Sequence, residues 1–123
     1  MTRVIVGHRS SGKTTELIRM AHDTDQYIIE PTRRQAVAVF RMARDMGLPI
    51  RMPVTPHELQ RTPLERTLYG RYHPGGGVLV DDLQEVLEQL GMRSRVDAVA
   101  VTSDDPPLVL YPGENLGARG AGQ

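Results

Sequence analysis

The chain has 123 residues, no formal net charge and no cysteine, and 39% of its residues are hydrophobic. These values fit one soluble globular domain with its own core, and they exclude disulfides and cysteine-ligated metal sites. Neither a membrane span nor a signal peptide is expected, because the apolar runs are too short. With one Phe, four Tyr and no Trp, a base-stacking platform for single-stranded nucleic acid is not expected either. We expect a cytoplasmic protein.

In the first half of the chain, strand-like and helix-like segments alternate. The β-branched run Arg3–Val6 predicts a strand, and the apolar spacing in Lys13–Ala21 predicts a helix. Gln26–Glu30 predicts a second strand. Thr32 is placed to cap the amphipathic helix that follows, and Gly47 is placed to end it.

The second half repeats this alternation. Ile50–Val54 predicts a poorer strand, because a proline interrupts it. Gly75–Asp82 is a continuous apolar run, as is typical of a strand covered on both faces. A helix is predicted over Leu83–Leu90, and two further strands over Asp97–Thr102 and Leu108–Tyr111.

The alternation predicts an α/β fold. We expect a three-layer sandwich, in which a mostly parallel sheet of five to six strands carries helices on both faces. Residues 1–112 are assigned to this domain and residues 113–123 to a flexible C-terminal tail. Ligands of such sheets bind at the carboxyl ends of the strands.

One loop has the pattern of a phosphate-binding site. GHRSSGKTT matches Gly-x-x-x-x-Gly-Lys-Ser/Thr between a predicted strand and a predicted helix. Glycines allow close approach to a phosphate, and backbone N–H groups at a helix N-terminus attract anions. Lys13 would reach the β- and γ-phosphates and Thr14 would place its hydroxyl on Mg²⁺, unless the segment is only a glycine-rich turn with a solvated lysine. The candidate nucleotide-binding residues are Gly7, His8, Arg9, Ser10, Ser11, Gly12, Lys13, Thr14 and Thr15.

Two carboxylates follow the apolar run VLV. Asp81 is placed to hold Mg²⁺ at the end of a buried strand, so the candidate metal ligands are Thr14 and Asp81. Asp82 is a candidate general base for an attacking water, or the cap of the next helix, and the two roles can coexist. Lys13 and Arg9 complete the candidate catalytic set, although Arg9 can also simply face solvent.

Other polar residues have weaker patterns. Thr102 and Ser103, at the end of a predicted strand, are candidate sensors of the γ-phosphate or loop caps. Arg93 and Arg95 would serve a neighbouring subunit's site, or form a solvated turn. The four histidines show no metal-ligand spacing.

The motifs GHRSSGKT and VLVDD resemble the Walker A and Walker B motifs of P-loop ATPases. The order of further segments resembles the ATPase core of phage large terminases and superfamily-two helicases. EPTRRQA (Glu30–Ala36) is similar to the Pro-Thr-Arg segment of both families, and VTPHEL (Val54–Leu59) to the helicase Thr-Pro segment. AVTS (Ala100–Ser103) stands where these families couple ATP state to DNA movement, and Arg9 stands where terminases often carry an arginine.

The resemblance implies a RecA-like P-loop NTPase fold and a Mg²⁺-dependent ATP hydrolase. The chain is too short for a second helicase domain or a terminase nuclease domain. It would act in DNA translocation or packaging only as a homo-oligomer or with a partner protein that supplies an arginine. These families usually have Asp-Glu where this chain has Asp81-Asp82. The alternative of a nucleotide-binding interaction module with little or no hydrolysis therefore stays open.

A second resemblance gives another alternative. SSGKTTELIRM (Ser10–Met20) is similar to a segment of thymidine kinases, but the zinc-binding cysteines and the nucleoside-covering lasso of that family are absent. The preference for ATP or GTP stays open, with Tyr111 and Pro112 as a guess for the adenine site. DNA binding through Arg33, Arg34 and the loop from residue 61 to 71 also stays open.

Overall fold

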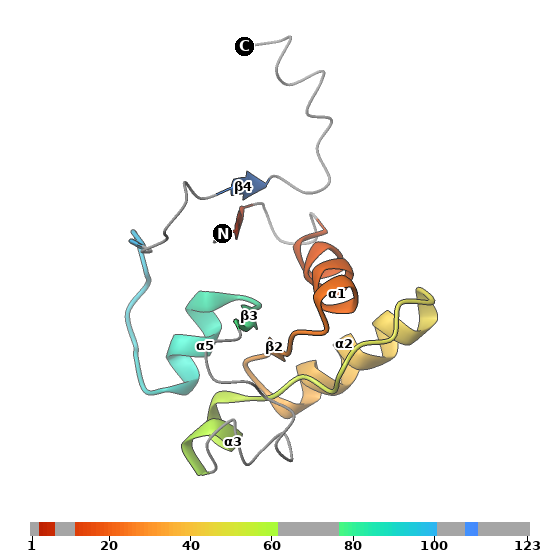
Figure 1. The fold of residues 1–123 in the computed structure, drawn as a ribbon. Coiled ribbons are helices and arrows are strands. Elements are labelled where there is room, and N and C mark those ends of the chain that lie inside the picture. Colours follow the sequence, from red (N-terminus) through yellow and green to blue (C-terminus); the bar gives the residue numbers. More distant parts are fainter. Residues whose placement is uncertain (1–2, 7–11, 62–76, 101–107, 111–123) are drawn as a thin grey trace, which may run out of the picture. The chain divides into compact units, whose positions relative to one another are not determined.

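The computed structural model describes residues 3–6, 12–61, 77–100 and 108–110 (Figure 1). The chain divides into two compact units. The terminal unit comprises Met1–Glu16 and Val96–Gln123, and the central unit comprises Leu17–Arg95. The boundary falls within the first helix. In the part of the chain that the structure describes, no helix has the length and apolar character needed to cross a membrane.

The terminal unit contains one pair of parallel strands, β1 (Arg3–Ile5) and β4 (Leu108–Leu110). In this pair Val4 lies opposite Val109. Both strands were expected from their apolar runs, and β1 ends one residue earlier than predicted, before Val6. The pairing joins the two ends of the chain in the parallel sense that the strand–helix alternation predicts.

The described residues contain four helices. They are α1 (Lys13–Thr24), α2 (Arg33–Asp45), α3 (Pro56–Arg61) and α5 (Leu83–Gln89). Three of them lie where the sequence analysis predicts a helix, and α3 is the addition. Thr32 caps α2 as expected, since its side chain accepts the N–H of Gln35 at 3.3 Å. Gly47 and Gly91 follow α2 and α5 with φ of +73° and +104°, a conformation that favours glycine.

The central unit contains three parallel segments side by side. β2 (Ile28–Ile29) pairs with β3 (Leu79–Val80) on one side and with Val54 on the other. The ladder continues past the strand ends, because Glu30 N–H donates to the Val54 carbonyl at 2.9 Å and Asp81 N–H donates to the Ile29 carbonyl at 3.0 Å. β2 is therefore the middle segment.

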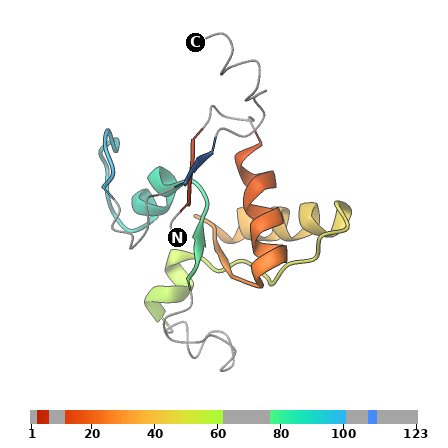
Figure 2. The same ribbon diagram turned by 45° about the horizontal axis from the view of Figure 1, so that its top comes forward.

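An apolar core surrounds β2. In Figures 1 and 2 the β2–β3 pair lies between α5 on one side and α1 with α2 on the other. This agrees with the expectation of helices on both faces of a parallel sheet. The buried apolar side chains of the described residues are Leu17, Ile18, Ala21, Ile28, Ala36, Val39, Ala43, Val54 and Val86.

Three predicted strands differ from the structure. Of Ile50–Val54 only Val54 pairs, because Pro53 before it has no N–H to donate. The run Gly75–Asp82 gives only the two-residue β3, and Val80 is 39% exposed rather than covered. Residues 97–100 form no strand, and Val99 is 57% exposed. A strand is stabilised by neighbours that the local sequence does not specify.

The larger architectural prediction is tested only in part by these elements. Every strand pairing in the described residues is parallel, as expected. The assembly of all strands into one sheet of a RecA-like three-layer sandwich stays a prediction. Residues 113–123, expected to form a tail, lie outside the described residues.

Candidate functional site

The carboxyl ends of the three parallel segments in the central unit carry polar residues that are buried. Glu30, Thr55 and Asp81 directly follow Ile29, Val54 and Val80, and they are only 2%, 4% and 8% exposed. They are the buried polar and charged residues among those described. We call this place the carboxyl edge. Its position is the one at which open parallel sheets bind ligands.

Glu30 and Asp81 form a buried carboxyl pair at the carboxyl edge. A hydrogen bond joins their side chains. Burial, this hydrogen bond and the charges of Asp81, Asp82 and Glu85 together raise the pKa of Glu30 to about 10. Glu30 is therefore a neutral acid at pH 7 and donates its proton to the bond with Asp81. Its Oε2 atom is buried and has no hydrogen-bond partner among the described residues.

The two acidic residues beside this pair make other contacts. Asp82 is exposed and caps α5, since its Oδ1 accepts the N–H of Glu85 at 3.3 Å. Its φ of 54° places it in the left-handed region, which Asp tolerates better than most residues. Glu85 Oε2 accepts a hydrogen bond from Gln35 Nε2 at 3.0 Å, which links α5 to α2. The capping role expected for Asp82 is confirmed, and its catalytic role stays a prediction.

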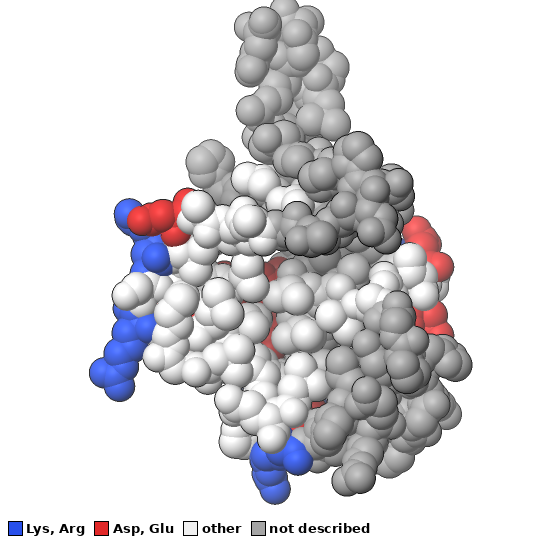
Figure 3. Space-filling view, turned by 60° about the vertical axis from the view of Figure 1, so that its left-hand side comes forward, with Lys and Arg blue, Asp and Glu red and all other residues white. Residues whose placement is uncertain are grey.

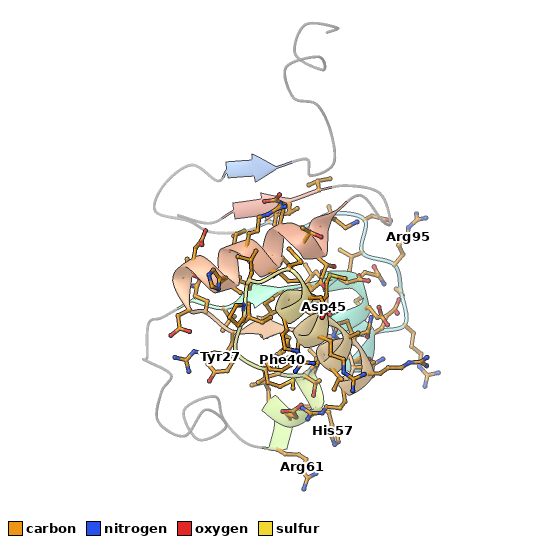
Figure 4. The ribbon with its side chains drawn as sticks, turned by 90° about the vertical axis from the view of Figure 1, so that its right-hand side faces the viewer. Tyr27, Phe40, Asp45, His57, Arg61 and Arg95 are labelled. Carbon is orange, nitrogen blue, oxygen red and sulfur yellow. The ribbon has the colours of Figure 1, made fainter. Side chains whose placement is uncertain are left out.

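A groove of about 470 Å³ opens beside the carboxyl edge. Its lining residues come from the first turns of α2 and α3 and from the end of α5: they are Pro31, Thr32, Arg33, Thr55, His57, Glu58 and Gln89. Arg33 and Glu58 face each other across it at 3.8 Å. Figure 4 shows His57 and Arg61 projecting outward from α3. The groove thus presents hydroxyl groups and basic groups together.

The predicted phosphate loop lies in the terminal unit and is described only at its end. Gly12 has a φ of +96°, and its carbonyl accepts the N–H of Glu16 at 3.1 Å as α1 begins at Lys13. Lys13, Thr14 and Thr15 are half-buried in the first turn. The following predicted residues lie outside the described residues: Gly7, His8, Arg9, Ser10, Ser11, Thr102, Ser103, Tyr111 and Pro112. Arg93 and Arg95 are exposed after α5.

Glu30 is the site residue that the sequence analysis missed. The sequence places an acid at the end of a predicted strand, which most often means a turn residue. The same local signal, an acid after an apolar run, led to the assignment of Asp81. If this signal is applied to both strands and the strands are expected to pair in parallel, the carboxyls of Glu30 and Asp81 are placed at one edge of the sheet.

The residues present fit the magnesium ion that the resemblance implies. Mg²⁺ takes one or two carboxylates together with phosphate oxygens and waters, and seldom an all-protein cage. Glu30 and Asp81 offer two buried carboxyls, one with an orphaned oxygen atom. No three acidic or histidine side chains of the described residues converge as a complete protein site would need. Asp81 would contribute a carboxylate to the ion, which neutralises phosphate charge when bound. Thr14, the other candidate ligand, belongs to the terminal unit.

The raised pKa of Glu30 predicts a specific pH dependence of stability. The pKa lies near 4.5 in the unfolded chain and about 10 in the folded one. Between these values only the folded state keeps the proton, so the contribution of Glu30 is complete below pH 4.5 and is lost as the pH rises through 10. We expect the free energy of unfolding, measured by urea denaturation in metal-free buffer, to fall between pH 5 and 9. The decrease is at most about 1.4 kcal/mol per pH unit.

Glu30→Gln should reduce this dependence, because glutamine cannot release a proton. Glu58→Gln is the matched control, since Glu58 is half-buried in the same unit and contacts Thr55 and Arg33. It should keep the wild-type pH dependence. An unchanged slope in Glu30→Gln would show that another group is responsible.

Comparison with protein-family models, curated proteins and solved structures found no match to this chain. What the chain does is therefore inferred from its own residues. Two features carry the chemistry: the glycine–lysine loop before α1 and the buried polar residues at the carboxyl edge.

Proposed function

We propose that the chain is a minimal P-loop ATPase core that binds ATP with Mg²⁺ and hydrolyses it. The observation that carries the proposal is the loop pattern GHRSSGKTT in its required context. A β-strand, β1, precedes the loop and α1 begins at Lys13. Gly12 has a φ of +96°, which explains the glycine at that position of the pattern.

The first turn of α1 supplies the positive potential for an anion. The first four N–H groups of a helix have no partner within it, and the helix dipole adds positive potential there. Lys13 is the chain's single lysine and stands at the first position of α1. In the proposed reaction Lys13 neutralises charge on the departing γ-phosphoryl group, and Arg9 is the second candidate cation. Catalysis of this kind rests on positioning and electrostatics.

The general base is assigned to Asp82 in this proposal. Oδ1 of Asp82 accepts the N–H of Glu85, so Oδ2 is the atom that would polarise the attacking water. Thr102 and Ser103 remain the proposed γ-phosphate sensors. We also propose that the protein acts in the cytoplasm. It would act as a homo-oligomer or with a partner protein that supplies an arginine. Thymidine-type kinase activity and nucleotide binding without turnover are the outcomes against which it is tested.

Lys13→Ala should reduce the affinity for ATP·Mg²⁺ by more than tenfold, because the lysine contacts the β- and γ-phosphates. A fluorescent ATP analogue measures the affinity, and Arg19→Ala is the control because Arg19 is an exposed cation on the same helix. The single lysine allows a second measurement on the wild type. ATP·Mg²⁺ should protect Lys13 from an amine-reactive reagent, as read by mass spectrometry.

Each result bears on the proposal. Equal affinities in wild type and Lys13→Ala, with no protection of Lys13, would remove the phosphate-loop assignment. Phosphate release from ATP that depends on Lys13 supports the ATPase. Transfer of phosphate to added thymidine in place of water would favour the kinase, and tight binding without phosphate release would favour the interaction module.

Asp82→Asn should separate capping from catalysis. Asparagine caps helices as well as aspartate and tolerates the left-handed region, so the stability should change by less than about 0.5 kcal/mol. ATP binding should persist, and turnover should fall by about 10²–10⁴-fold if Asp82 is the base. Asp82→Ala removes both roles and is the comparison. Undiminished turnover in Asp82→Asn would move the base to another residue.

A basic face on α2 favours DNA as the further partner of this ATPase. Arg33, Arg34, Arg41 and Arg44 are exposed. At about 100° per residue they fall within an arc of about 100°, on the side away from the buried Ala36, Val39 and Ala43. Figure 3 shows another feature of the surface: on the face in view, basic side chains lie at the margins and uncharged ones fill the centre. The α2 arginines are therefore the proposed phosphate-binding side chains.

Replacing Arg34, Arg41 and Arg44 together by alanine should weaken binding to duplex DNA and flatten its salt dependence. Each lost phosphate contact lowers the slope of log K against log salt by about 0.9. Fluorescence anisotropy at several salt concentrations measures both effects. Arg93→Ala with Arg95→Ala is the control, as these arginines are exposed elsewhere in the central unit. Equal losses in the two variants would show a general charge effect and no α2 interface.

A further inference from the structure

No role in the proposed ATPase reaction is assigned to the buried carboxyl of Glu30. It is 2% exposed, and its Oε2 has no hydrogen-bond partner among the described residues. Burying such an atom without a partner is unfavourable by about 1–3 kcal/mol, so an orphaned oxygen calls for an explanation. A leucine or a glutamine would fill the same space without burying an acidic group. The acid at this position therefore points to a ligand.

Backbone geometry holds this carboxyl beside Asp81. Glu30 N–H donates to Val54 at 2.9 Å, and Asp81 N–H donates to Ile29 at 3.0 Å. These bonds place the two acids at the ends of neighbouring parallel strands, and their side chains hydrogen-bond each other. The ladder thus fixes both carboxyls at one point of the carboxyl edge before any ligand arrives.

Like charges act on the Glu30 carboxyl from the described residues. Asp81, Asp82 and Glu85 are the charged groups that act on Glu30, and all are acidic. Two of them have other contacts, because Asp82 caps α5 and Glu85 accepts the amide of Gln35. A divalent cation bound at the two carboxyls would offset the like charges that act on Glu30.

We propose that Glu30 releases its proton to solvent when the metal arrives, becomes a second carboxylate of the magnesium site, and binds the ion of the ATP·Mg²⁺ complex together with Asp81. The inference rests on the proposed function, because two carboxylates become a full site only with phosphate oxygens and waters. It assigns to Glu30 a direct role in metal binding. The acid at the end of β2 thereby belongs to the same site as the acid at the end of β3.

The test measures metal binding rather than turnover. Mn²⁺, which replaces Mg²⁺ and gives an electron paramagnetic resonance signal, is titrated into the protein with a non-hydrolysable ATP analogue. Glu30→Gln should weaken Mn²⁺ binding by more than about tenfold, the lower range of losses seen when even an outer-shell partner of a metal ligand is removed. Its affinity for the analogue in the presence of EDTA should equal that of the wild type. Asp81→Asn should lose Mn²⁺ affinity likewise, and Glu58→Gln should keep it.

The outcomes separate this inference from the proposed function. If the wild type binds neither the analogue nor its Mn²⁺ complex, the proposed function fails and the inference fails with it. If the wild type binds the complex and Glu30→Gln binds Mn²⁺ equally well, the inference alone is overturned. An equal loss in Glu58→Gln also overturns it, because the effect is then one of total charge.

A measurement without any substitution covers the case in which Glu30→Gln does not fold. In wild-type protein labelled with ¹³C at the glutamate carboxyl carbons, Mn²⁺ with the analogue should broaden the Glu30 carboxyl resonance at the lowest Mn²⁺ ratio. The Glu58 resonance should persist at that ratio. A sharp Glu30 signal in the Mn²⁺ complex contradicts direct binding.

Discussion

The hydrogen bonds that β2 makes on both of its sides determine the geometry of the candidate site. Ile28 and Val54 lie in the core, at 0% and 3% exposure, and their burial fixes the pairing register. A shift by one residue would turn every side chain of β2 to the opposite face. Glu30 and Asp81 would then no longer meet. The apolar core therefore specifies where the polar groups lie, although none of its side chains takes part in the chemistry.

The carboxyl edge is also where the chain departs from the rules that the rest of it obeys. Elsewhere in the central unit, the core side chains are apolar, Thr32 and Asp82 cap their helices, and Gly47 and Gly91 occupy left-handed positions. At this edge two carboxyls are buried together, and one oxygen atom lacks a partner. A hydrophobic pair of similar volume would be at least as stable, since burying ionisable groups is unfavourable. Local departures of this kind are typical of functional sites, where stability is reduced in favour of binding.

How much the sequence could predict depended on the range of the interactions involved. Helix α2 was predicted well because Thr32 and Gly47 define its ends locally, and the cap of α5 by Asp82 was confirmed for the same reason. Strands were predicted less well, because pairing depends on distant neighbours. Val80 is exposed in the short β3, and no strand forms over residues 97–100 around Val99. Glu30 was missed because its partner Asp81 lies far along the chain, and no local pattern reports that contact. The phosphate loop rests on its pattern, since most of it lies outside the described residues.

The neighbouring acids Asp81 and Asp82 lie in different environments and have different proposed roles. Asp81 continues the line of β3 and is buried, whereas Asp82 turns into the left-handed region and starts α5 from an exposed position. A helix cap requires a short side chain, and the left-handed region favours Asp and Asn over longer residues. This gives a structural reason for aspartate where the resembled ATPases usually have glutamate. Capping restricts the Asp82 carboxylate through Oδ1, so whether this pair supports hydrolysis depends on the reach of one remaining oxygen atom.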